Sequence, residues 1–79
     1  MSKRAARSNQ DRLASLLKLA RRNAGLRQID VAQQLQQPQS FVSKYESGER
    51  ALTLTELKTI CDALGLSLVE MARQFEKEI

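Results

Sequence analysis

The stretch that most restricts the fold covers residues 28–50, QIDVAQQLQQPQSFVSKYESGER. Its first part, residues 28–35, predicts a short helix because apolar side chains recur there at helical spacing. Pro38 ends that helix, since proline has no backbone N–H and disfavours helical geometry in the residue before it. A second short helix is predicted over residues 39–46. Helices this short are marginal by themselves, so they must pack on a scaffold formed by the rest of the chain.

The second of these helices has two unequal faces. Only Val42 and Tyr45 are placed to point inward, so the helix gains little free energy from burial. The opposite face is polar and consists of Gln39, Ser40, Ser43 and Lys44. Side chains four residues apart lie on the same side of a helix. Amide, hydroxyl and ammonium groups are those that base edges and phosphates bind, so this face is predicted to contact nucleic acid.

The stretch LRQIDVAQQLQQPQSFVSKYESGER, from Leu26 to Arg50, resembles the helix-turn-helix of the Cro/phage-repressor (xenobiotic response element) family of bacterial DNA-binding regulators. The match extends from about Leu13 to Leu68, which is most of the chain. The resemblance implies an all-α fold, a compact five-helix bundle of the lambda-repressor type. It also implies a transcriptional regulator, in this case a repressor, that binds double-stranded DNA as a homodimer and places helix 39–46 in the major groove.

The same resemblance gives roles to individual residues. The side chains expected to contact bases are Gln39, Ser40, Ser43 and Lys44. Gln28 stands where the family has a glutamine that contacts a backbone phosphate, at a helix N-terminus whose N–H groups also suit an anion. Arg50 is a second expected phosphate ligand. Phe41 stands where the family often has a backbone-contacting residue, although without a hydroxyl its ring could instead touch a thymine methyl group.

The turn between the two helices departs from the family at Gln36 and Gln37, and also at Pro38, where serine or threonine commonly stands. Glycine usually stands at the position of Gln36 because the backbone commonly has a positive φ there, and glutamine in that conformation costs roughly 1 kcal/mol. A buried aliphatic residue commonly stands at the position of Gln37. We expect altered packing of the turn without loss of binding. Glu46 would repel phosphate, so it is expected to accept a hydrogen bond or an ion pair within the protein.

Three further helices are predicted around this unit. The first covers residues 9–24 and stops at Gly25, where glycine permits left-handed geometry. The second begins at the capping box Thr53–Glu56 and ends at Gly65, and the third begins at the similar box Ser67–Glu70. Their inward faces are predicted from apolar spacing: Leu13, Leu16, Leu17, Ala20 and Ala24; Leu54, Leu57, Ile60, Cys61 and Leu64; Leu68, Val69, Ala72, Phe75 and Ile79.

The last helix carries more apolar surface than a small bundle needs, and exposed apolar surface marks an interface. In the family the last helix often helps to form a two-fold dimer. Leu68, Met71 and Phe75 are therefore expected at a dimer interface. The alternative is that this helix only completes the core of the monomer.

Basic residues are concentrated in the first part of the chain. Residues 1–27 hold eight basic side chains and one acidic one, whereas residues 28–79 hold five and eight. This asymmetry suggests an anionic partner. Residues 1–8 are predicted to be a flexible basic arm that could follow the DNA backbone or reach into a minor groove, with a loose tail or an extra helical turn as the alternative. One DNA-binding domain is predicted over residues 9–79. A basic half on this fold would also suit an acidic protein, so an antitoxin-like protein-interaction module is the alternative function.

Several kinds of site are not expected. The chain has no histidine and a single cysteine, Cys61, so it can form neither an internal disulfide nor a zinc site of the usual ligand count. There is no phosphate-binding loop, carboxylate pair or catalytic triad, so no enzyme, metal or cofactor is predicted. No run of ~18 apolar residues occurs, so no membrane partner is expected and the predicted location is the cytoplasm of a bacterium or of a phage host.

Overall fold

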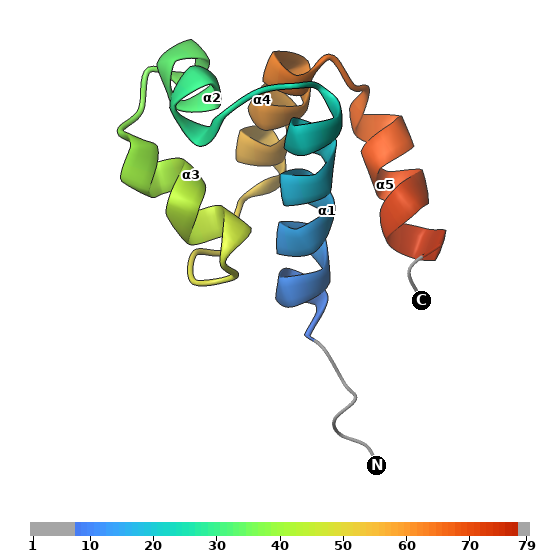
Figure 1. The fold of residues 1–79 in the computed structure, drawn as a ribbon. Helices are drawn as coiled ribbons and strands as arrows, with labels where there is room; N and C mark the ends of the chain where they lie inside the picture. The colour runs from blue at the N-terminus through green and yellow to red at the C-terminus, as the bar shows by residue number, and fades with distance from the viewer. Residues whose placement is uncertain (1–7, 78–79) are drawn as a thin grey trace.

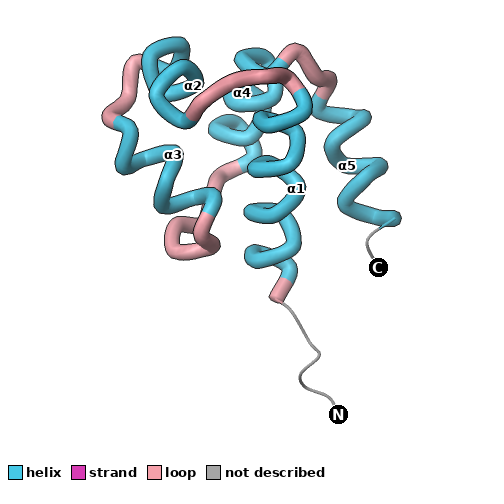
Figure 2. Tube along the Cα trace, viewed as in Figure 1, coloured by secondary structure: helices cyan, strands magenta, loops and turns pink. Residues whose placement is uncertain are grey.

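The computed structural model describes residues 8–77, and five helices make up most of that part of the chain (Figure 1). They are α1 (Asn9–Asn23), α2 (Gln28–Leu35), α3 (Gln39–Glu46), α4 (Leu54–Leu64) and α5 (Leu68–Lys77). Short loops join them, and no strand occurs between residues 8 and 77 (Figure 2). The predicted all-α five-helix fold is confirmed. Of the predicted arm, residues 1–7 lie outside the described residues, as does Ile79 of the last helix.

The helix ends follow the capping residues in the sequence. The Ser8 hydroxyl accepts a hydrogen bond of 3.0 Å from the backbone N–H of Asp11 at the start of α1. Thr53 and Glu56 form the predicted reciprocal capping box at the start of α4. Gly25 has a φ of +75°, so it ends α1 in the left-handed conformation as expected, with the last helical residue one position earlier than predicted.

The core lies where α1 and α4 meet the other helices. In Figure 1, α1 and α4 occupy the middle of the molecule, the pair α2–α3 lies on one side and α5 lies on the other. Contacts between α1 and α3, and between α2 and α4, attach the helix pair to this scaffold. The largest fully buried side chains come from all five helices: Leu17, Val31, Val42, Ile60, Cys61 and Met71. The leucine-rich scaffold therefore supports α3, which could bury little by itself.

The faces of α4 and α5 differ from the prediction at four residues. Leu54 was expected in the core but is 69% exposed, and it is the first residue of α4. Met71 was expected at a dimer interface but is fully buried inside the monomer. It shares the inward stripe of α5 with the half-buried Leu68 and Phe75. Val69 and Ala72 were predicted to face inward, but both are exposed, and the exposed fraction of Val69 is 67%.

An arginine of α1 holds the C-terminal part of α5 in place. The Nη2 atom of Arg12 donates a hydrogen bond of 3.0 Å to the backbone carbonyl of Phe75. The guanidinium carbon of Arg12 also lies 4.5 Å from the centre of the Phe75 ring, in a cation–π contact. This contact keeps the Phe75 ring against the body of the monomer.

Candidate nucleic-acid interface

The polar face of α3 points away from the protein. Val42 and Tyr45 are buried and anchor the helix to the core, as the spacing predicts. The four side chains expected to contact bases are all exposed: Gln39, Ser40, Ser43 and Lys44. Their predicted orientation is thus confirmed, and their contact with DNA stays a prediction. A protruding eight-residue helix of this kind has dimensions that fit the major groove.

The turn before α3 adopts the geometry for which the family uses glycine. Gln36 has φ 56° and ψ 43°, which is the left-handed conformation. Its neighbour Gln37 donates a backbone hydrogen bond of 3.0 Å to the carbonyl of Ala32, so the end of α2 is closed in spite of the strain. Pro38 then takes the N-cap position of α3 in an extended conformation. The departures from the family therefore leave intact the turn that sets the angle between α2 and α3.

A buried ion pair fixes the end of α3 to the end of α1. Arg21 and Glu46 are each only 8% exposed. The Nε atom of Arg21 lies 2.7 Å from Oε2 of Glu46, and Nη2 lies 3.1 Å from Oε1. The remaining terminal nitrogen of Arg21 donates to the backbone carbonyl of Leu26 at 2.7 Å. The hydrogen bonds that Arg21 donates to Glu46, together with the negative charge of that carboxylate, raise the pKa of Arg21 despite the opposing effect of burial.

This pair answers the question of why a helix expected near phosphates contains an acid. Glu46 was predicted to accept an ion pair within the protein, and that prediction is confirmed. Arg21 lies in the last turn of α1, and the apolar spacing of that helix did not predict its burial. A buried charge needs a partner of opposite charge. The glutamate in α3 was therefore the signal in the sequence for a basic side chain packed against it.

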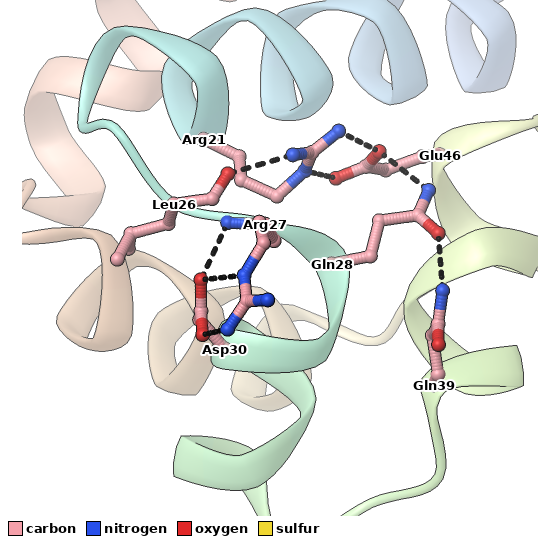
Figure 3. A network of polar contacts seen from close by, with 7 residues as sticks. All are labelled: Arg21, Leu26, Arg27, Gln28, Asp30, Gln39 and Glu46. Carbon is pink, nitrogen blue, oxygen red and sulfur yellow. Dashed lines mark hydrogen bonds and ion pairs between the residues drawn. The ribbon is translucent and has the colours of Figure 1, made fainter.

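The ion pair continues outward as a chain of hydrogen bonds, shown in Figure 3. The side-chain nitrogen of Gln28 donates to Oε1 of Glu46 at 3.1 Å. The side-chain nitrogen of Gln39 donates in turn to the side-chain oxygen of Gln28 at 3.3 Å. The expected phosphate ligand at the start of α2 and the expected base-contacting residue at the start of α3 are therefore side by side. The spacing in the sequence did not predict this connection.

The start of α2 carries a second, exposed ion pair. The carboxylate of Asp30 accepts a hydrogen bond from the backbone N–H of Arg27 at 2.8 Å. It also accepts two from the guanidinium group of Arg27, at 2.9 and 3.1 Å. The side-chain bonds first, and then the backbone bond, lower the pKa of Asp30 to about 2. Arg27 is 78% exposed in its side chain, so it adds a basic group beside Gln28.

Arg50 and Phe41 are held together on the other side of α3. Arg50 forms two hydrogen bonds with the carboxylate of Glu56, at 3.1 and 3.0 Å, and its guanidinium carbon lies 4.8 Å from the centre of the Phe41 ring. Phe41 also meets the ring of Tyr45 edge-on at 5.5 Å. The phosphate contact of Arg50 stays a prediction. Phe41 is half-buried, with its ring against the Arg50 guanidinium, and its own contact with the DNA backbone stays a prediction.

An open hollow lies between Arg50 and Phe41 and the exposed face of α3. It is lined by Gln37, Pro38, Ser40, Phe41, Lys44, Glu49 and Arg50. Ser40 and Lys44 therefore face the same space as the guanidinium of Arg50. Positive and hydrogen-bonding groups are thus present on both sides of α3, at the start of α2 and in the loop before α4, which is the arrangement needed to contact the two backbones that border a groove.

Comparison with known families gives a match to the helix-turn-helix model over residues 17–71, most of the chain. The chain belongs to the helix-turn-helix family of the Cro and phage-repressor type. The predicted resemblance is thereby confirmed for this helix-turn-helix protein. A comparison with curated proteins by sequence gave no match.

Solved structures of regulators resemble the helix-turn-helix protein over nearly its whole length. The restriction-modification controller protein C.Esp1396I, in its wild-type form, is 25% identical, with a TM-score of 0.84 over 92% of this chain and 96% of that one. The same values hold for its tetramer in complex with its natural 35 base-pair operator. The clp gene regulator ClgR from C. glutamicum is 19% identical, with a TM-score of 0.85 over 94% and 96% of the two chains, and supports the fold alone.

The described helices contain no candidate for a membrane span, since none of those between residues 8 and 77 is both long and apolar enough. Within the same residues, no three histidine, cysteine or acidic side chains gather as a metal site would require.

Proposed function

We propose that this helix-turn-helix protein is a sequence-specific double-stranded DNA-binding transcriptional regulator that represses by occupying a promoter. The observation that carries the proposal is the exposed polar face of α3, held rigidly outward by Val42, Tyr45 and the buried Arg21–Glu46 pair. The fold is shared with a controller protein whose structure includes its operator. The proposed setting is the cytoplasm of a bacterium or of a phage host.

In this proposal, α3 enters the major groove and four side chains contact base edges: Gln39, Ser40, Ser43 and Lys44. Gln28 and the N-terminus of α2 bind one phosphate, and Arg50 binds another while Glu56 and Phe41 hold it in place. Arg27 is added to the phosphate-binding group because it is exposed next to Gln28. Phosphate contacts set the position of the protein, and the base contacts of α3 supply the specificity.

We also propose that the protein binds as a homodimer whose subunits contact half-sites about 34 Å apart, one helical turn of DNA. The dimer surface we propose differs from the one expected from the sequence. Met71 is buried, so the surface is centred on the exposed side of α5, at Val69 and Ala72. Exposed apolar side chains of this size on a small domain favour burial against another copy.

Selection of bound sequences from a random duplex pool tests the DNA-binding proposal, followed by titration of the selected duplex. We expect a selected sequence with two-fold symmetry. We also expect the logarithm of the association constant to fall by about 0.9 per phosphate contact for each tenfold rise in salt concentration. Lys44→Ala is expected to lose ~1–3 kcal/mol of base discrimination. The matched control is Lys58→Ala on α4, which removes the same charge from an exposed lysine that pairs with Asp62.

The outcome that would reject the proposal is a protein that selects no sequence, or one for which the two lysine variants behave alike. A protein without a preferred duplex would favour the alternative, an interaction module for an acidic partner. Sedimentation tests the dimer separately. We expect Val69→Glu to convert the dimer to a monomer. The control is Gln33→Glu, which makes the same change of charge at an exposed residue of α2 and is expected to leave the mass in solution unchanged.

A further inference from the structure

The charge of Glu46 sets the direction of each hydrogen bond between the core and the surface of α3. An ionised carboxylate only accepts hydrogen bonds, and the arginine opposite only donates them. Glu46 forms an ion pair with Arg21, with 2.7 Å between Nε and Oε2. The side-chain amide of Gln28 lies next to Glu46 and must therefore point its nitrogen at the carboxylate, as observed at 3.1 Å. The orientation of this amide follows from the chemistry of its neighbour.

The constraint passes from Gln28 to Gln39. With its nitrogen committed to Glu46, Gln28 presents its side-chain oxygen to α3, and this oxygen can only accept. Gln39 must therefore donate one N–H inward, which it does at 3.3 Å. The amide of Gln39 then has its own oxygen and its second N–H left for a ligand at the exposed surface. One acceptor and one donor are presented together, in a fixed arrangement.

That pattern distinguishes the two purines in the major groove. Adenine presents the N7 acceptor and the N6 donor, so it needs one donor and one acceptor from the protein. Guanine presents two acceptors, N7 and O6, and needs two donors. If Gln39 were turned the other way, with its oxygen facing inward, both of its N–H groups would point outward and would suit guanine. The inward bond thus decides which purine Gln39 can pair with.

We infer that Glu46 is a positioning residue which, through Gln28, sets the donor and acceptor pattern of Gln39 and so makes the protein select adenine over guanine at the base that Gln39 contacts. This inference rests on the proposed function. The buried Arg21–Glu46 pair is suited to the task because both side chains are almost fully shielded from water, so water cannot replace either partner. The Gln28–Gln39 bond is at the surface and would have no preferred direction without it.

The test measures binding to two selected duplexes that differ only in adenine or guanine at one position. The position is identified as the one where Gln39→Ala removes the base preference. For the wild type, we expect the adenine duplex to bind about 10-fold more tightly, within the range that a bidentate pair gives. Gln28→Met removes the connecting amide, and we expect the adenine-to-guanine ratio to fall by at least about threefold. Its lost phosphate contact weakens both duplexes equally and cancels in the ratio.

Two further variants act on Glu46 itself. Glu46→Gln introduces an amide whose oxygen faces Arg21 and whose nitrogen faces Gln28, so the direction of the chain is reversed and the ratio shifts toward guanine by about 10-fold. If this variant does not fold, as judged by circular dichroism, Arg21→Met/Glu46→Leu replaces the pair with apolar side chains of similar size. We expect the ratio of that double variant to fall as it does for Gln28→Met.

The inference is overturned if the folded Gln28 or Glu46 variants keep the full adenine-to-guanine ratio, or if the base that depends on Gln39 is not adenine. Failure of the proposed function has a different result. In that case the wild type selects no duplex, or Gln39→Ala leaves the preference unchanged at every position.

Discussion

Breaking the Arg21–Glu46 pair from one side is predicted to destabilise the protein severely. Arg21→Met leaves the carboxylate of Glu46 buried, with its side chain 3% exposed, and removes two of its three observed donors. An uncompensated buried charge costs about 3–5 kcal/mol. A domain of 79 residues has a total free energy of unfolding of only about 4–12 kcal/mol. The variant is therefore expected to lose between about a quarter and all of its free energy of unfolding.

Urea unfolding followed by circular dichroism measures this loss. The apolar double variant Arg21→Met/Glu46→Leu removes both charges, and its free energy of unfolding is expected within about 1 kcal/mol of the wild type, because the desolvation of both ions is removed together with their attraction. Arg22→Met, at the exposed neighbouring position on α1, is the control and is expected to change stability by less than about 0.5 kcal/mol. A loss below about 1 kcal/mol in Arg21→Met, or a double variant no better than the sum of the two single variants, would refute the reasoning.

Three further predictions concern stability and reactivity. Hydrogen bonds from Arg50 and Thr53 lower the pKa of Glu56 from 4.5 to about 2. The contribution of Glu56 to stability is therefore complete above pH 4.5 and is lost as the pH falls through 2. A urea midpoint that declines as steeply in Glu56→Gln as in the wild type over that range would contradict this prediction. Gln36→Gly relieves the positive φ at the end of α2 and should raise the free energy of unfolding by about 1 kcal/mol in thermal or urea melts, whereas a loss would mean that this backbone is not strained. Cys61 is fully buried, which raises the pKa of its thiol, so a thiol reagent should modify it only after denaturant is added, and rapid labelling of the native protein would contradict the fold.

Most of the fold was predictable because its local signals agree with one another. Capping boxes, apolar spacing and Gly25 placed the five helices to within about one residue of the observed ends. The positive φ at Gln36 was expected from the resemblance and is present. These features depend on neighbours within one or two turns, which a sequence pattern records directly.

The errors concern which apolar side chains of α4 and α5 are covered by other helices and which stay exposed. Periodicity groups Leu68, Met71 and Phe75 on one stripe of α5, but it does not say whether that stripe faces the core or another molecule. The structure shows that it faces the core, with Met71 fully buried and Phe75 held by Arg12 of α1. Leu54 has core spacing, yet as the first residue of α4 it stays exposed. Such coverage depends on the packing of distant elements.

For the candidate site, the sequence predicted the exposed side chains of α3 but not the contacts between elements. The pairing of Glu46 was predicted without its partner, which proved to be Arg21, 25 residues away. Arg50 was expected as a phosphate ligand, but its bonds to Glu56 and its contact with Phe41 were not foreseen. Contacts of this kind depend on the relative placement of helices, whereas exposure along a short helix follows from its own spacing.

The most direct test of the central claim is an NMR titration of the isotope-labelled protein with its selected duplex. A polar helix held outward by the core should insert into the groove, so the largest changes in amide chemical shift are expected within residues 39–44 and at Gln28, with small changes across residues 58–62 of α4. Large changes confined to α4 or α5, with α3 unaffected at saturation, would show that the duplex binds elsewhere and would contradict the account.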